Sequence, residues 1–232
     1  GTAGVAFTFD GLSSTQRAQL TADVGTQEKL IDYLRGDGAN EQPNGLGFRK
    51  RIRAASVNDA TKTAPSPLGD IINSDPAFVA SENFGYQSLA EGLATSTTPY
   101  DTFRLSKSAR PRVVYVGAND GMLHAFHAGL SSANNVAGLI GSGTELFAYI
   151  PNSLMPNLSA LADPNYAHRY YVDAPPFSGD AFVGGAWKTM LVGSVGAGGK
   201  AVFALDVTDP ENFDATKVHW EFTNDELGNS MG

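Results

Sequence analysis

Apolar and polar residues alternate on both sides of a tight turn in the segment VVYVGANDGMLHAFHA at 113–128. The apolar positions recur at the two-residue period of a strand with two distinct faces, at Val114 and Val116 and then at Leu123 and Ala125. Asn-Asp-Gly between two apolar runs is typical of a hairpin, because these residues tolerate the positive φ angles that tight turns require. The pattern predicts two antiparallel strands joined by a turn at Asn119, Asp120 and Gly121.

The same pattern returns about 75 residues later in TMLVGSVGAGGKAVFALDV at 189–207. Its turn contains Gly196, Gly198 and Gly199. We expect a further strand after each hairpin, at 146–151 and 218–222, and an extended segment before each, at 70–80 and 171–176. Four antiparallel strands repeated at a fixed interval are typical of propeller blades, and a plain β-sandwich is the alternative.

The first part of the chain has a different pattern. Residues from about 12 to 35 are expected to be helical, with Thr26 as a possible N-cap and Gly36 at the end. Residues 37–67 are rich in Gly, Pro, Asn and charge and indicate a long surface connection. Its basic residues Arg49, Lys50, Arg51 and Arg53 are expected to be solvated, and the alternative is that they pair with acidic blade loops or meet an anionic surface. The chain thus divides into a helical segment with a connecting loop at 1–67 and the first blades of an incomplete propeller at 68–232.

The expected fold class is therefore mainly β: a partial β-propeller of four-stranded antiparallel blades preceded by a short helical segment. Propellers close with about four to eight blades, whereas two fit into this chain. We therefore expect the chain to be part of a longer propeller, whose third unit begins near LGNSMG at 227–232.

Composition excludes several classes of protein. The net charge of −8 does not provide the basic surface that a nucleic-acid binder requires. The sequence has no apolar run long enough to cross a bilayer and no signal-peptide pattern at its start, so a signal for export would lie upstream. There is no cysteine, which excludes disulfides and thiolate metal sites.

RPRVVYVGANDGMLHAFHAG at 110–129, with LGDIINSDPAFVAS before it and ALDVTDP and WEFTNDELG after it, resembles the PilC/PilY family. These proteins are type IV pilus tip-associated adhesins and biogenesis factors, and the resemblance extends from about Tyr33 to Gly228. It implies a secreted, non-enzymatic protein on the surface, fimbrium or outer membrane of a Gram-negative bacterium, whose C-terminal half is a quinoprotein-like propeller. It also implies binding to minor pilins at the pilus tip, and roles in pilus extension, host adhesion, virulence and twitching motility.

Two departures from the family pattern matter. His127 stands where the family usually has Asp, as Asp206 does in the second unit. The calcium loop DxDxDxxxD of the family does not occur between Gly1 and Gly232. We therefore expect no cofactor in this segment and assign any calcium site to other parts of the parent protein.

Arg35-Gly36-Asp37 is the RGD tripeptide that integrins recognise, and the resemblance implies host-cell binding by an RGD before the propeller. In such recognition, Arg enters an acidic groove and Asp completes the coordination sphere of a metal on the receptor. The alternative is local: Gly36 is equally well explained as the C-terminal residue of a helix.

The remaining candidates carry weaker signals. Asp206, Asp209 and Asp214 form an acidic stretch that could hold a cation, although the spacing is not that of an EF-hand and Asp-Pro is also an ordinary turn. His124 and His127 are three residues apart on a strand and point to opposite faces, so we expect them to be structural rather than metal ligands.

Two other functions compete with the pilus adhesin. Quinoprotein dehydrogenases share blade motifs such as NDGMLHAF, but they bind pyrroloquinoline quinone beneath a vicinal disulfide and beside a calcium ion. This chain has no cysteine, and the required acidic residues are not evident. The second alternative is a generic propeller scaffold in outer-membrane assembly that binds only other proteins.

Overall fold

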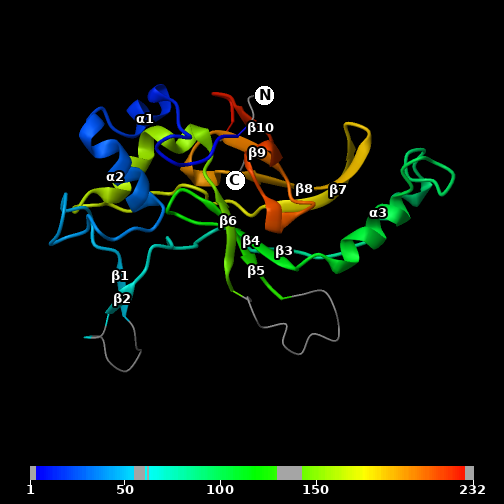
Figure 1. Ribbon diagram of the computed structural model, residues 1–232, viewed down its shortest axis with the longest axis horizontal. Coiled ribbons are helices and arrows are strands. Elements are labelled where there is room, and N and C mark those ends of the chain that lie inside the picture. Colours follow the sequence, from blue (N-terminus) through cyan, green and yellow to red (C-terminus); the bar gives the residue numbers. More distant parts are fainter. Residues whose placement is uncertain (1–3, 55–60, 62, 130–142, 228–232) are drawn as a thin grey trace.

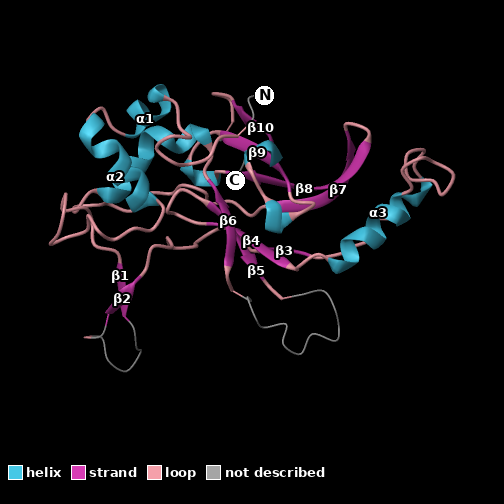
Figure 2. Ribbon diagram, viewed as in Figure 1, coloured by secondary structure: helices cyan, strands magenta, loops and turns pink. Residues whose placement is uncertain are grey.

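The computed structural model describes residues 4–54, 61, 63–129 and 143–227, which form two four-stranded antiparallel sheets, a two-stranded ribbon and a set of helices (Figures 1 and 2). The first sheet has the order β3-β4-β5-β6, with β3 at Ala77–Val79, β4 at Val113–Gly117, β5 at Leu123–His127 and β6 at Glu145–Tyr149. The second has the order β7-β8-β9-β10, with β7 at Phe177–Val183, β8 at Ala186–Ser194, β9 at Ala201–Asp206 and β10 at Val218–Thr223. Sequential four-stranded sheets confirm the expected fold class, a mainly β partial propeller. The segment 228–232, at the start of the expected third unit, lies outside the described residues.

The first hairpin forms as expected, but its turn works differently. β4 and β5 pair from Val113 with His127 to Gly117 with Leu123. Gly121 has a φ of +95°, whereas Asn119 and Asp120 form the turn without a positive φ. Asp120 contributes through its side chain instead: Oδ1 accepts from the Met122 amide at 3.1 Å and Oδ2 from the Gly69 amide at 2.6 Å. The turn is therefore held by an aspartate and bent by one glycine.

The second sheet begins later than the sequence indicated. The expected strand at 171–176 is wrong, and β7 at Phe177–Val183 takes its place. Tyr171, Val172 and Asp173 are buried, like strand residues, but they connect the two hairpin turns. The Val172 amide donates to Ala118 O at 3.4 Å, and the Asp173 amide donates to Val195 O at 3.3 Å.

The turn of the second hairpin includes a short 3-10 helix, η4, at Gly196–Gly198. Gly196 has a φ of +54°, which favours glycine. Gly198 is required for a different reason: a Cβ there would lie 1.8 Å from the carbonyl oxygen of Tyr171. The glycines of this turn thus include one needed for its backbone angle and one needed for close approach.

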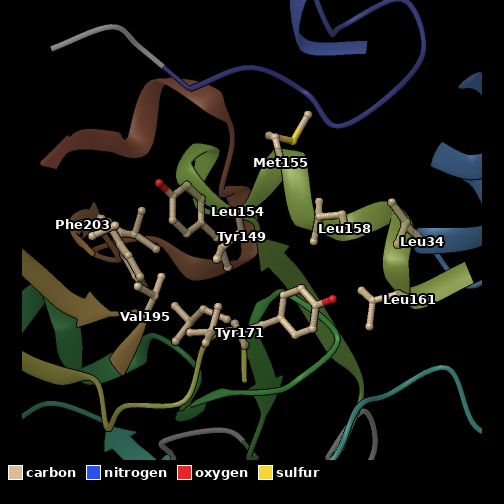
Figure 3. Close-up of a cluster of buried hydrophobic side chains, with 14 of the residues drawn as sticks. Leu34, Tyr149, Leu154, Met155, Leu158, Leu161, Tyr171, Val195 and Phe203 are labelled. Carbon is tan, nitrogen blue, oxygen red and sulfur yellow. The ribbon is translucent and has the colours of Figure 1, made fainter. Parts of the chain in front are cut away.

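One face of each sheet contributes to a common core. The Tyr149 ring of β6 lies 4.9 Å from the Phe203 ring of β9, and Phe147 stacks on Phe213 at 3.7 Å (Figure 3 shows Tyr149 and Phe203). The first strands β3 and β7 contact each other, and the last strand β6 contacts the short helix η5 at Pro210–Asn212. The first strands of the two sheets therefore lie together, as in successive blades of a propeller.

Two helices form the N-terminal segment: α1 at Ser14–Leu20 and α2 at Val24–Leu34. The expected cap at Thr26 is wrong, because Asp23 caps α2 by accepting from the Gly25 amide at 3.1 Å. Both helices contact the 3-10 helix η3 at Asn152–Ala162, and Figure 3 shows Leu34 beside Leu158 and Leu161. The helical segment thus shares the core of the sheets. The boundary at residue 67 stays a prediction.

The connection 37–67 contains more structure than expected. β1 at Ile52–Ala54 pairs antiparallel with β2 at Thr63–Pro65, and the intervening residues 55–60 and 62 lie outside the described part. Arg49 donates from Nε to Leu161 O at 2.9 Å and lies over the Tyr166 ring. The expectation of a solvated basic loop was therefore wrong for Arg49, which ties the connection to η3.

Residues 80–112 form an insertion between β3 and β4. It contains η1 at Tyr86–Ser88, α3 at Tyr100–Ser106 and η2 at Lys107–Ala109, and α3 extends away from the sheets (Figure 1). Trp187 of β8 anchors the insertion: its ring stacks on Tyr86 at 5.7 Å, and its Nε1 donates to Thr98 O at 2.9 Å. The insertion of the first sheet is therefore fixed on the second. No helix in the described ranges is both long and apolar enough to cross a membrane.

Candidate functional site

The tripeptide Arg35-Gly36-Asp37 lies directly after α2, and all three residues are exposed. Arg35 is the C-cap, and Gly36 follows with a φ of +108° while its amide donates to Tyr33 O at 2.9 Å. The local reading of Gly36 as a helix terminator therefore holds. This role of Gly36 does not exclude binding of the tripeptide by a receptor, because all three residues are on the surface.

Hydrogen bonds hold both charged side chains of the tripeptide. Arg35 Nη1 donates to Phe7 O at 3.0 Å, and Asp37 Oδ1 accepts from the Ala39 amide at 2.7 Å. The Asp37 amide donates to Asp32 O at 2.9 Å. A receptor would therefore meet a defined conformation rather than a free loop, and it would have to compete with the bond to Phe7.

Arg51 fixes the segment that follows the tripeptide. Its Nε contacts Glu41 Oε1 at 2.7 Å, its Nη1 donates to Tyr33 O at 2.7 Å, and its Nη2 donates to Asp37 O at 3.1 Å. The guanidinium also lies over the Tyr33 ring, 3.7 Å from the centroid. Burial of the Tyr33 ring raises the pKa of its hydroxyl, and the nearby cation opposes this. The sequence carries no local signal for Arg51, because its partners are 10 to 18 residues away.

A groove adjoins the tripeptide on the side of the ribbon β1–β2. Its volume is about 400 Å³, and its lining includes Gly36, Glu41, Lys50, Arg51 and Pro67. A second cavity of about 210 Å³ lies between the connection and the first hairpin turn, next to Arg49, Asp70 and Asp120. The exposed tripeptide therefore lies on a surface that contains a groove and charged groups of both signs.

The first hairpin turn carries a cluster of ionisable groups. His124 Nδ1 contacts Glu145 Oε1 at 2.5 Å, and Nε2 contacts both Asp120 oxygens at 3.1 Å. Burial of the ring opposes protonation, but hydrogen bonds to the two carboxylates outweigh it and raise the pKa of His124 to about 9. His124 thus acts as a cation between two carboxylates. His127 has another partner, since its Nδ1 accepts from the Gly129 amide.

The acidic stretch after β9 does not come together. Asp206 pairs with Lys188 at 2.9 Å, Asp209 accepts from the Asn212 side chain at 2.9 Å, and Asp214 accepts from the Thr216 amide at 2.8 Å. Burial of Asp206 opposes ionisation, but hydrogen bonds from Thr208 and Lys188 outweigh it and lower the pKa. Within the described residues, no three His, Cys, Asp or Glu side chains are placed to hold a metal ion.

A buried polar network joins the insertion to the second sheet, and the sequence did not indicate it. Tyr100 Oη donates to Asp180 Oδ2 at 2.6 Å, Thr189 Oγ1 donates to Asp180 Oδ1 at 2.8 Å, and Lys107 forms an ion pair with the same carboxylate. Burial lowers the pKa of Lys107, and the contact with Asp180 opposes this. Lys107 and Asp180 are 73 residues apart in the chain, so no local pattern reveals the pair.

Comparison with known proteins identifies relatives. The model of the PilY1 beta-propeller domain matches residues 68–231. A Type IV pilus biogenesis factor PilY1 homolog of Xylella fastidiosa is 37% identical over 97% of this chain and 14% of its own length. Type IV pilus biogenesis factor PilY1 of Pseudomonas aeruginosa strain PAK is 39% identical over 97% of this chain and 18% of its own length. The crystal structure of the Pseudomonas aeruginosa PilY1 C-terminal domain is 38% identical, with 67% of this chain and 27% of that chain covered and a TM-score of 0.48.

The family match and the two curated relatives agree with the resemblance seen in the sequence. The chain spans less than a fifth of the length of these two curated relatives, whereas the family match covers more than half of this chain. The matched region contains all strands of both four-stranded sheets. The chain therefore belongs to the PilY1 β-propeller domain family.

Proposed function

We propose that the chain forms the first two blades of the propeller in a type IV pilus biogenesis factor, and that it acts by binding proteins and not by catalysis. The observation that carries this proposal is the match of the PilY1 propeller to both sheets. The relatives that cover nearly the whole chain are named as type IV pilus biogenesis factors. The role belongs to a longer protein, which we place on the cell surface or at the pilus tip of a Gram-negative bacterium.

The outer face of the second sheet supports a role in protein contacts. One face of this sheet carries a row of residues that pair across its four strands: Phe177, Val192, Ala204 and Trp220. Phe222 lies on the same face. The exposed fractions are 74% for Phe177, 40% for Trp220 and 52% for Phe222. Exposed aromatic groups of this kind mark contact surfaces. The second sheet packs on the face of the first sheet that carries Tyr149. We infer that a following blade packs in the same way on the face of the second sheet that carries Phe177, Trp220 and Phe222.

The test of the main proposal is genetic. A strain that lacks the parent protein should lose surface pili and twitching motility, and full-length protein should restore both. Minor pilins should co-purify with the full-length protein, as expected for a tip complex. Normal piliation in the deletion strain would refute the proposal. A quinoprotein dehydrogenase would instead show a thermal shift on addition of pyrroloquinoline quinone.

We further propose that Arg35, Gly36 and Asp37 bind an integrin-type receptor and contribute to adhesion and virulence. Exposure of all three residues and their fixed conformation after α2 support this proposal. The change Asp37→Glu in the full-length protein keeps the charge but moves the carboxylate. It should reduce adhesion to purified integrin at least tenfold, whereas the matched control Asp32→Glu, on the exposed side of α2, should not. Equal adhesion of both variants would exclude the tripeptide.

A further inference from the structure

Lys107 and Asp180 form a contact that is almost completely shielded from water. The exposed fraction of the side chain is 1% for Lys107 and 0% for Asp180, and Nζ lies 2.5 Å from Oδ2. Lys107 begins η2 in the insertion of the first sheet, and Asp180 lies in the middle of β7 in the second sheet. The contact therefore joins two segments that are distant in sequence.

The surroundings of this pair are aromatic. Lys107 Nζ lies 4.9 Å from the centroid of Phe103 and 5.8 Å from that of Phe84. Tyr100 is fully buried beside them. Loss of hydration in such a pocket lowers the pKa of the Lys107 amine, which favours the neutral, nucleophilic form.

The two oxygens of Asp180 have different donors. Thr189 Oγ1 donates to Oδ1 at 2.8 Å, and Tyr100 Oη donates to Oδ2 at 2.6 Å. A donor on Oδ1 stabilises negative charge that develops there when a nucleophile attacks Cγ. A donor on Oδ2 assists its departure as water. Oδ1 is thus placed to carry the negative charge, and Oδ2 is placed to leave.

We propose that Lys107 and Asp180 react with each other to form an intramolecular isopeptide bond between Nζ and Cγ. The ion pair first transfers one proton from Nζ to Oδ2, giving a neutral amine and a carboxylic acid. The amine attacks Cγ to form the C–N bond, and the tetrahedral intermediate places its negative charge on Oδ1 beside Thr189. The attached nitrogen passes one proton to the Oδ2 hydroxyl, the C–Oδ2 bond breaks, water leaves and the Cγ–Oδ1 double bond re-forms. The ammonium and the carboxylate become one secondary amide and one molecule of water, so no oxidant or other reactant is required.

Such a bond would fasten the insertion of the first sheet to the first strand of the second. It would close a covalent loop from residue 107 to residue 180, which limits the unfolded chain in the same way as a disulfide. The chain has no cysteine, so disulfides cannot perform this task here. The isopeptide bond would keep the two sheets connected even when a pulling force separates their other contacts.

Tryptic digestion of the denatured full-length protein tests the proposal directly. Trypsin does not cleave after an acylated lysine. The linked form therefore gives one branched peptide in which residues 105–112 are joined to residues 170–188. Its mass is lower by one water than the summed masses of these two peptides. The unlinked form gives separate peptides 105–107, 108–112 and 170–188. Detection of the branched peptide by mass spectrometry is the expected result. Complete recovery of the separate peptides, without the branched one, would overturn the proposal.

Two variants provide the matched controls. Lys107→Arg keeps the positive charge but cannot form the amide, so the branched peptide should disappear. Lys188→Arg alters the Lys188–Asp206 pair in the same sheet, where the lysine side chain is 29% exposed. This variant should leave the branched peptide unchanged. Persistence of a branched peptide in Lys107→Arg would show that Lys107 is not the residue involved.

Discussion

Tyr149 of β6 and Glu221 of β10 are joined by a hydrogen bond of 3.1 Å from Tyr149 Oη to Glu221 Oε2. The same carboxylate accepts from the amides of Asn152 at 2.7 Å and Ser153 at 2.8 Å. These amides begin η3, where donors without partners within the helix favour an anion. A residue of the last strand in the second sheet thus holds the segment that follows the first sheet.

Removal of this carboxylate should weaken the contact between the sheets. We expect Glu221→Ala to lower the free energy of unfolding by about 2–3 kcal/mol, because three hydrogen bonds to a charged acceptor are lost. Urea denaturation measures the change. Glu28→Ala, at an exposed position of α2, is the control and should change stability by less than about 0.5 kcal/mol. Equal effects of the two substitutions would contradict this role of Glu221.

Arg110 makes a second connection between the sheets. Its Nη2 donates to Ala80 O after β3, and its Nη1 donates to Thr189 Oγ1 of β8 at 3.0 Å. Lysine cannot reach both groups with a planar fork, so Arg110→Lys should cost about 2–3 kcal/mol in thermal or urea unfolding. Arg104→Lys, in an exposed pair with Asp101, should be nearly neutral. A neutral Arg110→Lys would show that charge alone is sufficient at this position.

Adjacent glycines in the second hairpin turn should differ in their tolerance of a methyl group. In Gly198→Ala, the new Cβ would lie 1.8 Å from Tyr171 O, so the backbone must shift, and we expect a loss of more than about 3 kcal/mol. Gly199→Ala has its nearest contact at 3.5 Å, with the Val195 side chain, and extended backbone angles, so it should cost less than about 1 kcal/mol. Melting temperatures of the two variants compare them directly. The reverse order would contradict the described turn.

The cluster around His124 predicts a pH dependence of stability. The pKa of His124 is about 9 in the folded chain and about 6.5 when unfolded, so the folded state binds the proton more tightly. The stabilisation is fully present below about pH 6.5 and is lost as pH rises through about 9, up to about 3 kcal/mol in total. Urea denaturation between pH 6 and 10 should show this decline in the wild type and a much smaller one in His124→Gln. Parallel curves would refute the assignment.

Local signals account for what could be predicted of the fold. The turn residues and the apolar segments on either side of them revealed both hairpins, which form as the paired strands β4–β5 and β8–β9. Among these four strands, burial alternates with a period of two in β8, whereas β4, β5 and β9 are buried on both faces. Tyr171 and Val172 are buried as strand residues are, but their amides donate to the first hairpin turn, so a strand was wrongly expected there. At α2, Asp23 and Thr26 both have cap chemistry, and only the structure shows that Asp23 accepts the bond.

The candidate sites were less accessible to sequence reasoning. The tripeptide at Arg35 was visible as a motif, but its exposure depends on where α2 packs. The acidic stretch was visible too, yet Asp206 points to Lys188 rather than toward Asp209 or Asp214. The network at Asp180 depends on groups from the insertion and from β8, and no spacing in the chain encodes such a meeting.

The insertion at 80–112 has a consequence for the order in which the chain matures. Because the chain is synthesised from its N-terminus, Tyr86 and Arg110 are made well before their partners Trp187 and Thr189. Contacts across such long separations form late, because the entropy of closing the loop must be overcome first. The early half therefore stays incomplete during synthesis, and its apolar groups need protection until the later half has been made.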